Sequence, residues 1–360
     1  MATCGGDTIA ALHPMELRAL SAKPLVSILV SNYNYARYIG EAIESALGQT
    51  YSDIELIICD DGSTDNSVDI IEGYQRKDPR LQLIRKANGG QASGFNAAFS
   101  ASRGELVALL DSDDCFLPHK IEKIVADFQA HPDAGFGLHR VIRMSADRRR
   151  QGVWPMSAPL PSGWYGSSLL RGGGILAYMP PTSGLSFHRD VAERMFPLPV
   201  GPILVSCPDQ LITRLAPLLT SVTHADEALS EYRLHGDNNY GPDRVSAASF
   251  KRELDYCAAL WHAQKLFLAA IAPGLEQQLQ PLEVNDYFAF ASYLHARLSS
   301  DRDARRHYDR FIATLRKDDK FRWFWRFSIY LPLAIFDFAV NTLIRQSWLK
   351  QLVSRLKRRS

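Results

Sequence analysis

The stretch from Glu105 to Phe116, ELVALLDSDDCF, constrains the fold more than any other part of the 360-residue chain. It contains five consecutive apolar residues, 106–110, followed by the carboxylates Asp111, Asp113 and Asp114. The apolar run is too short for an ordinary helix and fits a strand that is buried on both faces. Ligands of open parallel sheets bind beyond the carboxyl ends of the strands, so these acids lie where a site is expected.

Three acids this close together repel one another unless a cation neutralises them. An Asp-x-Asp pair beside a bound diphosphate suits a hard divalent ion, Mg²⁺ or Mn²⁺. The alternative is a solvated turn that caps the next helix, because Asp is also favoured in turns.

The neighbouring sequence favours a site over a turn. Strand patterns recur at residues 25–30, 54–59, 81–84, 106–110 and 135–144, and helical apolar spacing separates them. Such alternation predicts an α/β fold with a mostly parallel sheet and helices on both faces. Polar clusters follow four of these strands, at Asn32–Asn34, Asp60–Asp65, Asn88–Gln91 and Asp111–Asp114. Four clusters at one edge of one sheet form a site.

The remainder of the chain divides by pattern. Residues 150–245 are less regular and rich in Gly and Pro, whereas 246–318 show helical apolar spacing. We therefore predict four parts: an N-terminal extension (1–22), a sheet domain (23–245), a C-terminal helical appendage (246–320) and an amphipathic tail (321–360).

The tail is basic and aromatic. Residues 321–360 hold eight Lys or Arg and one acid, whereas the preceding 320 residues hold 33 basic and 38 acidic residues. Aromatic residues gather first, and an apolar face with basic flanks follows: Trp323, Phe324, Trp325, Phe327 and Tyr330, then Trp348, Leu349, Leu352, Val353 and Leu356. Pro332, Asp337 and Asn341 interrupt the run between, which argues against a spanning helix. The pattern predicts a helix lying on an anionic membrane surface; a helix docked on protein is the alternative.

Composition narrows the class of protein. Apolar residues make up 46% of the chain, which is ample for a globular core. A basic tail on a mildly acidic body is not the charge pattern of a uniformly basic nucleic-acid binder. The five cysteines show no paired spacing, and the first 22 residues lack a basic start followed by an apolar core. We expect a cytoplasmic protein, peripheral on the inner face of the membrane.

Six motifs carry a resemblance to a known family. They are VSILVSNYNYARYIGEAIES, IELIICDDGSTDNS, NGGQASGFNAA, GELVALLDSDD, CPDQL and YRLHGDNN. In this order they resemble the family-2 glycosyltransferases of GT-A (Rossmann-like) fold, over about two thirds of the chain. The resemblance implies transfer of a sugar from a nucleotide-diphosphate donor, with Mn²⁺ or Mg²⁺ as cofactor.

The resemblance also implies roles for individual residues. The implied donor-binding residues are Asn32, Tyr33, Asp61, Gly89, Gly90, Asn96, Asp111 and Ser112. Asp113 is implied as the ligand that bridges the metal to the diphosphate, and His235 as a second metal or phosphate ligand. Each role has a structural alternative, because Asp-Gly is a common turn pair at Asp61 and a lone histidine is often structural.

Asp209 resembles the catalytic base that removes the proton from the acceptor hydroxyl. Its alternative is an ordinary N-cap. Two departures from the family pattern stand out: Pro208 replaces the usual acid before the base, and Phe95 stands where an arginine is frequent. The resemblance implies inversion at the anomeric carbon. No Gln-x-x-Arg-Trp follows Asp209, which favours non-processive transfer.

The expected activity is therefore that of a hexosyltransferase in polysaccharide biosynthesis. The expected donor is a UDP-sugar, and the acceptor a hydroxyl of a saccharide or lipid-linked saccharide. Two other functions stay open. A haloacid-dehalogenase-like phosphatase also places Asp-x-Asp after a strand, and a catalytically inactive nucleotide-sugar-binding protein would tolerate the two departures. A nicotinamide oxidoreductase is disfavoured because no Gly-x-Gly-x-x-Gly follows the first strand.

Overall fold

The computed structural model describes residues 12–154, 160–171, 179–201, 204, 207–235, 246–282, 285–314 and 322–345. The chain forms two compact units. The sheet unit comprises Ala11–Ser167 and Tyr178–Asn239, and the helical unit comprises Met1–Ala10, Ser168–Ala177 and Tyr240–Ser360. The division into four parts that the sequence favours stays a prediction.

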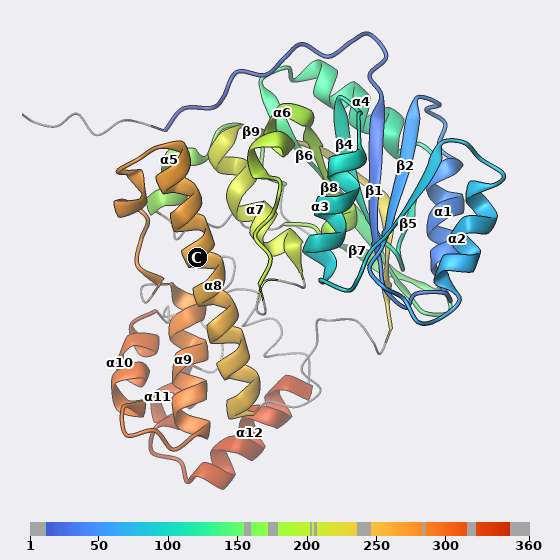
Figure 1. Ribbon diagram of the computed structural model, residues 1–360. Helices are drawn as coiled ribbons and strands as arrows, with labels where there is room; N and C mark the ends of the chain where they lie inside the picture. Colours follow the sequence, from blue (N-terminus) through green and yellow to red (C-terminus); the bar gives the residue numbers. More distant parts are fainter. Residues whose placement is uncertain are drawn as a thin grey trace, which may run out of the picture. The chain divides into compact units, whose positions relative to one another are not determined.

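Strands and helices alternate along the sheet unit, as the sequence predicts (Figure 1), and the short helix at 166–171 crosses into the helical unit at Ser168. The elements are β1 (Val26–Asn32), α1 (Ile39–Leu47), β2 (Ile54–Asp60), α2 (Ser67–Gln75), β3 (Leu81–Arg85), α3 (Gln91–Ala101), β4 (Leu106–Asp111), β5 (Cys115–Phe116), α4 (Lys120–Ala130), β6 (Ala134–Ser145), β7 (Arg150–Trp154), α5 (Gly166–Arg171), η1 (Thr182–Gly184), β8 (Leu185–His188), α6 (Arg189–Met195), α7 (Pro208–Leu219) and β9 (Ser221–Leu234). Proline is favoured at the first position of a helix, so a helix is expected to begin at Pro118; this expectation is wrong, because Pro118 lies in a turn and α4 begins at Lys120.

In the described residues the strands form one nine-stranded sheet of order β3-β2-β1-β4-β8-β6-β9-β5, with β7 on β6. Strands β3, β2, β1 and β4 are mutually parallel. Antiparallel β8 separates β4 from β6, so β6 and its parallel neighbour β9 run in the same direction as β4. The carboxyl ends of β1, β2, β3, β4 and β9 therefore point to one edge of the sheet.

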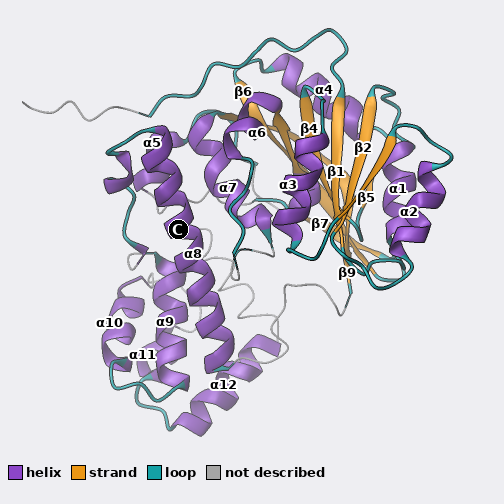
Figure 2. Ribbon diagram, in the orientation of Figure 1, coloured by secondary structure: helices purple, strands orange, loops and turns teal. Residues whose placement is uncertain are grey.

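Helices cover both faces of the sheet (Figure 2), and the contacts of the strand side chains show which helices lie on each face. Alternate residues of β1, among them Ile28, pack with Ile43 of α1 and Ile121 of α4 in one apolar cluster. Side chains alternate between faces along a strand, so Ser31 lies on the opposite face, where it contacts Gly94 of α3. Helix α3 thus covers one face, while α1 and α4 cover the other.

The helical unit contains α8 (Ala247–Ile271), η2 (Leu275–Gln277), α9 (Asp286–Leu298), α10 (Ala304–Thr314), α11 (Arg322–Ser328) and α12 (Leu333–Arg345). Its aromatic core includes Phe290, Tyr293, Phe311, Trp325 and Phe336. Trp325 is fully buried, so the prediction that it lies at a membrane surface is wrong; it packs against Phe290 and Phe311 instead.

Other aromatic and apolar residues of the predicted tail are exposed. These exposed residues are Phe327, Tyr330, Leu333, Ile335 and Phe338. The side chains of Arg322 and Trp323 and the whole segment 346–360, with its basic amphipathic pattern, lie outside the described residues. Among the helices of the described residues, none combines the length and the hydropathy that a membrane crossing requires.

Candidate active site

The loops that follow β1 and β2 are joined by side-chain hydrogen bonds at the carboxyl edge of the sheet. The strand register places Asn32 opposite Asp60, and the Asn32 amide donates to the Asp60 carboxylate at 2.9 Å. Asn34, which has a φ of 59°, accepts from the Thr64 backbone N–H at 2.7 Å. Among the residues that the structure describes, none is a hydrogen-bond partner of the carbonyl oxygen of the fully buried Asn32 side chain. A buried acceptor of this kind is available for a ligand N–H.

Asp61 connects the second loop to the third. Its carboxylate, 1% exposed, accepts from Lys86 Nζ and from the backbone N–H groups of Gly89 and Gly90, the last at 2.6 Å. These donors from the third loop hold the Asp61 carboxylate in one orientation. The structure brings together Asp61, Gly89 and Gly90, whose donor-binding role stays a prediction, and it adds Lys86, which was not predicted.

Asp111 ends β4, opposite Ser31 of β1. Gln91 at the start of α3 donates to its carboxylate at 2.6 Å. Desolvation, followed by repulsion from Asp113 and Asp209, raises the pKa of Asp111 well above its usual range. The three acids therefore share one electrostatic environment, in which a cation would relieve the repulsion.

Asp113 pairs with His235, which follows β9. The Oδ2 atom of Asp113 lies 2.8 Å from Nε2 of His235. The imidazole is nearly buried and packs against the rings of Tyr35 and Tyr38, with centroid distances of 5.9 and 5.1 Å. These contacts fix the ring, so its Nε2 atom faces the Asp113 carboxylate.

The Asp113–His235 pair fits a divalent cation. Two adjacent ligands at about 2.1 Å from an octahedral ion lie roughly 3 Å apart, close to the separation of these two atoms. Within the described residues, no group of three His, Cys, Asp or Glu side chains is arranged to hold a metal alone. A cation here would take its remaining ligands from a diphosphate and water.

Asp114 is held by hydrogen bonds from neighbouring groups of the protein. Both of its oxygens have partners: Oδ2 accepts from the Ser183 hydroxyl at 2.6 Å, and Oδ1 from the Arg233 backbone N–H at 2.8 Å. Desolvation and the neighbouring Asp113 and Asp111 raise its pKa. This fully buried side chain anchors the acidic loop to β9 and η1.

Asp209 lies in the first turn of α7, directly after Pro208. Cys207 precedes them with a φ of 59°. Desolvation raises the pKa of Asp209 to about 6, against the opposing effect of backbone hydrogen bonds from Gln210 and its own N–H. A carboxylate that titrates near neutral pH is suited to proton abstraction. Asp209 also raises the pKa of Asp111, which places it beside the acids of β4.

Three of the expected donor-binding side chains are either exposed or hydrogen-bonded to the protein backbone. Tyr33 is 44% exposed. The Asn96 amide exchanges two hydrogen bonds with the Leu198 backbone, at 2.9 and 2.7 Å, so here it holds the loop after α6. Ser112 donates to the Ser31 carbonyl at 2.7 Å. Donor binding by these three side chains stays a prediction.

Several residues at this edge were not predicted from the sequence. They are Lys86, Thr182, Ser183, Tyr232 and Arg233, whereas Gln91 lies in the predicted cluster Asn88–Gln91. Desolvation and then the charges of Asp114, Asp111, Asp113 and Asp209 raise the pKa of Tyr232. A usable signal existed for two of them: Tyr232 and Arg233 stand in the YRLHGDNN motif beside His235. The last residues of that motif, 236–239, lie outside the described part of the chain.

Known proteins share both sequence and fold with this chain. A sequence profile described as Glycosyl transferase family 2 matches residues 27–196. An uncharacterized glycosyltransferase of Nostoc sp. is 40% identical over 230 residues, which is 63% of this chain and 69% of that protein. The hyaluronan synthase of Pasteurella multocida is 43% identical over 117 residues, 32% of this chain but only 12% of the synthase.

Two solved structures resemble the fold at low identity. Staphylococcus aureus TarS 1–349 in complex with UDP-GlcNAc has a TM-score of 0.54 and 19% identity, covering 93% of this chain and 88% of its own. The mannosyltransferase PcManGT from Pyrobaculum calidifontis, in complex with GDP-Man and Mn²⁺, has a TM-score of 0.54 and 15% identity, covering 96% and 89%.

Proposed function

The chain belongs to glycosyl transferase family 2 and has the GT-A fold, and from this premise we propose a metal-dependent, inverting and non-processive transfer of one sugar. The donor is a UDP-sugar, and the acceptor is a hydroxyl of a saccharide or lipid-linked saccharide. One observation carries the proposal: Asp111, Asp113 and Asp209 share one electrostatic environment, and His235 pairs with Asp113. The UDP-GlcNAc complex of the TarS fragment supports the choice of nucleotide.

In this proposal Asp113 and His235 would hold Mn²⁺ or Mg²⁺, and such a cation would supply positive charge against the negative charge that develops on the departing nucleoside diphosphate. Asp111, oriented by Gln91, accepts hydrogen bonds from donor hydroxyls. The unpartnered Asn32 carbonyl and the Asp61–Lys86 pair lie on the neighbouring loops, where they hold the nucleotide.

Asp209 takes the proton from the acceptor hydroxyl as that oxygen attacks the anomeric carbon. A pKa of about 6 leaves the carboxylate mostly ionised at neutral pH and still basic enough to receive a proton. One displacement on the face opposite the leaving phosphate inverts the anomeric configuration. No covalent intermediate is needed, so Asp111 need not act as a nucleophile.

The experiment that tests this proposal is isothermal titration with UDP-sugars, GDP-mannose and the free diphosphates, in Mn²⁺, in Mg²⁺ and with chelator. We expect metal-dependent binding of UDP-sugars that Asp113→Asn abolishes. Binding of a folded protein to none of these ligands would reject the proposal and favour the phosphatase. Binding without transfer to any acceptor would favour an inactive binding protein.

We also propose that the enzyme is peripheral on an anionic membrane at the cytoplasmic face. The support is the set of exposed apolar residues between Phe327 and Phe338, of which Phe338 is 74% exposed, followed by the basic sequence of 346–360. Full-length protein should co-sediment with anionic vesicles, and both Phe338→Asp and a chain ending at Arg345 should bind them more weakly. Equal co-sedimentation of all three proteins would argue against a membrane role.

A further inference from the structure

Arg233 of β9 is a buried charge placed directly behind the acidic loop. Its side chain is 1% exposed, and its Nε donates to the backbone carbonyl of Asp113 at 2.7 Å. Its own backbone N–H donates to Asp114 at 2.8 Å. One residue therefore holds the backbone of the predicted metal ligand and the carboxylate that follows it.

The same guanidinium supports the second predicted ligand through an aromatic ring. Its carbon lies 4.8 Å from the ring centroid of Tyr38, which in turn lies 5.1 Å from the ring of His235. Arginine stacks favourably on aromatic rings, so this contact orders Tyr38 against His235. Asp113 and His235 are thus both tied to Arg233.

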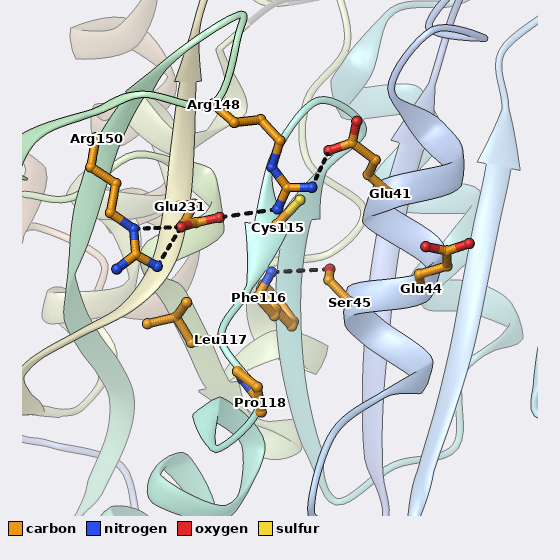
Figure 3. A pocket seen from close by; sticks show the side chains of 10 residues that line it. All are labelled: Glu41, Glu44, Ser45, Cys115, Phe116, Leu117, Pro118, Arg148, Arg150 and Glu231. Atoms are coloured by element: carbon orange, nitrogen blue, oxygen red, sulfur yellow. Dashed lines mark hydrogen bonds and ion pairs between the residues drawn. The ribbon is translucent and has the colours of Figure 1, made fainter.

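The charge of Arg233 is balanced by Glu41 of α1, whose Oε2 lies 2.8 Å from its Nη2. Glu41 also lines a cavity of about 380 Å³, where it pairs with Arg148 at 3.2 Å (Figure 3). Beyond it, Glu231 lies 2.7 Å from Arg150. A buried arginine is costly unless it is paired, so the position of Arg233 depends on Glu41.

We propose that Arg233 and Glu41 form a positioning pair that holds Asp113 and His235 at the separation a divalent cation requires. The inference rests on the proposed function, because it concerns the cation site of that reaction. The pair does not touch the reactants. Its effect is on metal affinity, because loss of an outer partner of a metal ligand typically weakens binding by about 10–100-fold.

The test measures Mn²⁺ binding directly, from the electron paramagnetic resonance of free Mn²⁺ in the presence of UDP, and kinetics separately. We expect the Mn²⁺ Kd of Glu41→Gln to rise by at least about tenfold, with kcat at saturating Mn²⁺ close to that of the unsubstituted enzyme. Glu41→Asp, which keeps the carboxylate charge, should have a Mn²⁺ Kd between that of Glu41→Gln and that of the unsubstituted enzyme. Arg150→Ala is the matched control from the same cavity and should bind Mn²⁺ normally.

The outcomes separate the two ideas. If folded Glu41→Gln and Glu41→Asp bind Mn²⁺ within twofold of the unsubstituted protein, the positioning role is overturned and the proposed function stands. If Arg150→Ala weakens Mn²⁺ binding as much as Glu41→Gln, the effect is general to the cavity and the pair has no special role. If the unsubstituted protein binds no Mn²⁺, the proposed metal dependence fails and this inference fails with it.

Discussion

Oδ2 of Asp113 and Nε2 of His235 lie 2.8 Å apart, although 122 residues separate the two side chains in the chain. The contact exists because β9 runs in the same direction as β4, so that both strands end at one edge of the sheet. Asp113 follows the end of β4, and His235 follows the end of β9. The sheet topology thus brings together two side chains, both proposed as metal ligands, that no local sequence pattern could bring together.

The first prediction concerns this pair. Asp113→Asn should lower kcat/KM by at least about 100-fold, because the loss of roughly 3 kcal/mol of charge stabilisation corresponds to that factor. Steady-state kinetics with varied donor, repeated at increasing Mn²⁺, measures it. Asp147→Asn, in the exposed turn before β7, is the matched control and should keep full activity. Retention of activity by Asp113→Asn would remove this residue from the metal site.

The second prediction is a pH dependence set by Asp209. The base acts when ionised, and its pKa is raised to about 6 by desolvation, so kcat/KM should fall about tenfold per pH unit below that value. A profile from pH 4.5 to 8.5 should lose this limb in Asp209→Asn, along with most activity. A profile that is flat through pH 6 in the unsubstituted enzyme would exclude Asp209 as the base.

Asp209→Asn should also change stability, in a direction that separates catalysis from folding. A carboxyl whose pKa is raised by folding destabilises the native state as pH rises above its unfolded value. The neutral Asn variant should therefore have a higher Tm than the parent at pH 8, and the difference should shrink toward pH 4. A lower Tm at both pH values would indicate that Asp209 has a structural role, such as capping α7.

The third prediction assigns Lys86 to donor binding. Phe95 stands where an arginine is frequent in the family. Lys86 supplies a positive charge to the predicted donor-binding loops, and it pairs with the buried Asp61. Lys86→Ala should raise the donor KM about tenfold, because charged hydrogen bonds contribute about 1.5–3 kcal/mol, and kcat should change little. Lys77→Ala, which removes a lysine beside the Tyr74 ring, is the control. An unchanged donor KM would contradict the assignment.

The parallel half of the sheet could be predicted from sequence because three of its strands, β1, β2 and β4, are apolar runs buried on both faces. The runs ending at Asn32, Asp60 and Asp111 lie where expected, and so do the polar residues that follow them. The short strands β5 and β7 were not predicted, whereas β8 lies at the end of RGGGILAYMPPTSGLSF, where a strand is expected to follow a loop. Strand β5 is only two residues long and pairs with β9, far later in the chain, and β7 is five residues long and pairs with the end of β6 across a short turn.

The residues whose burial was not predicted from sequence, Arg233 and Trp325, have one feature in common: tertiary packing sets their environment. Arg233 is a charged residue within a strand, and its burial depends on Glu41, which lies 192 residues away. Trp325 belongs to an aromatic run that would suit a membrane surface as well as a core, and only the packing of α9 and α10 decides between them. The pattern of polar and apolar residues alone does not show whether such a residue is buried in the core or exposed at a surface.

The fourth prediction tests how closely α3 must approach the sheet. A Cβ atom at Gly94 would lie 2.1 Å from Oγ of Ser31, so Gly94→Ala forces α3 away from β1. We expect a loss of about 1–3 kcal/mol in the free energy of unfolding, as is typical of overpacking, and weaker donor binding because Gln91 starts the same helix.

Gly73→Ala, also within a helix but with 3.9 Å to its nearest neighbour, should instead stabilise by about 0.5–1 kcal/mol. Ser31→Gly should restore most of the stability lost in Gly94→Ala, and denaturant unfolding of both single variants and the double variant measures this coupling. Purely additive effects would show that the contact does not set the position of α3.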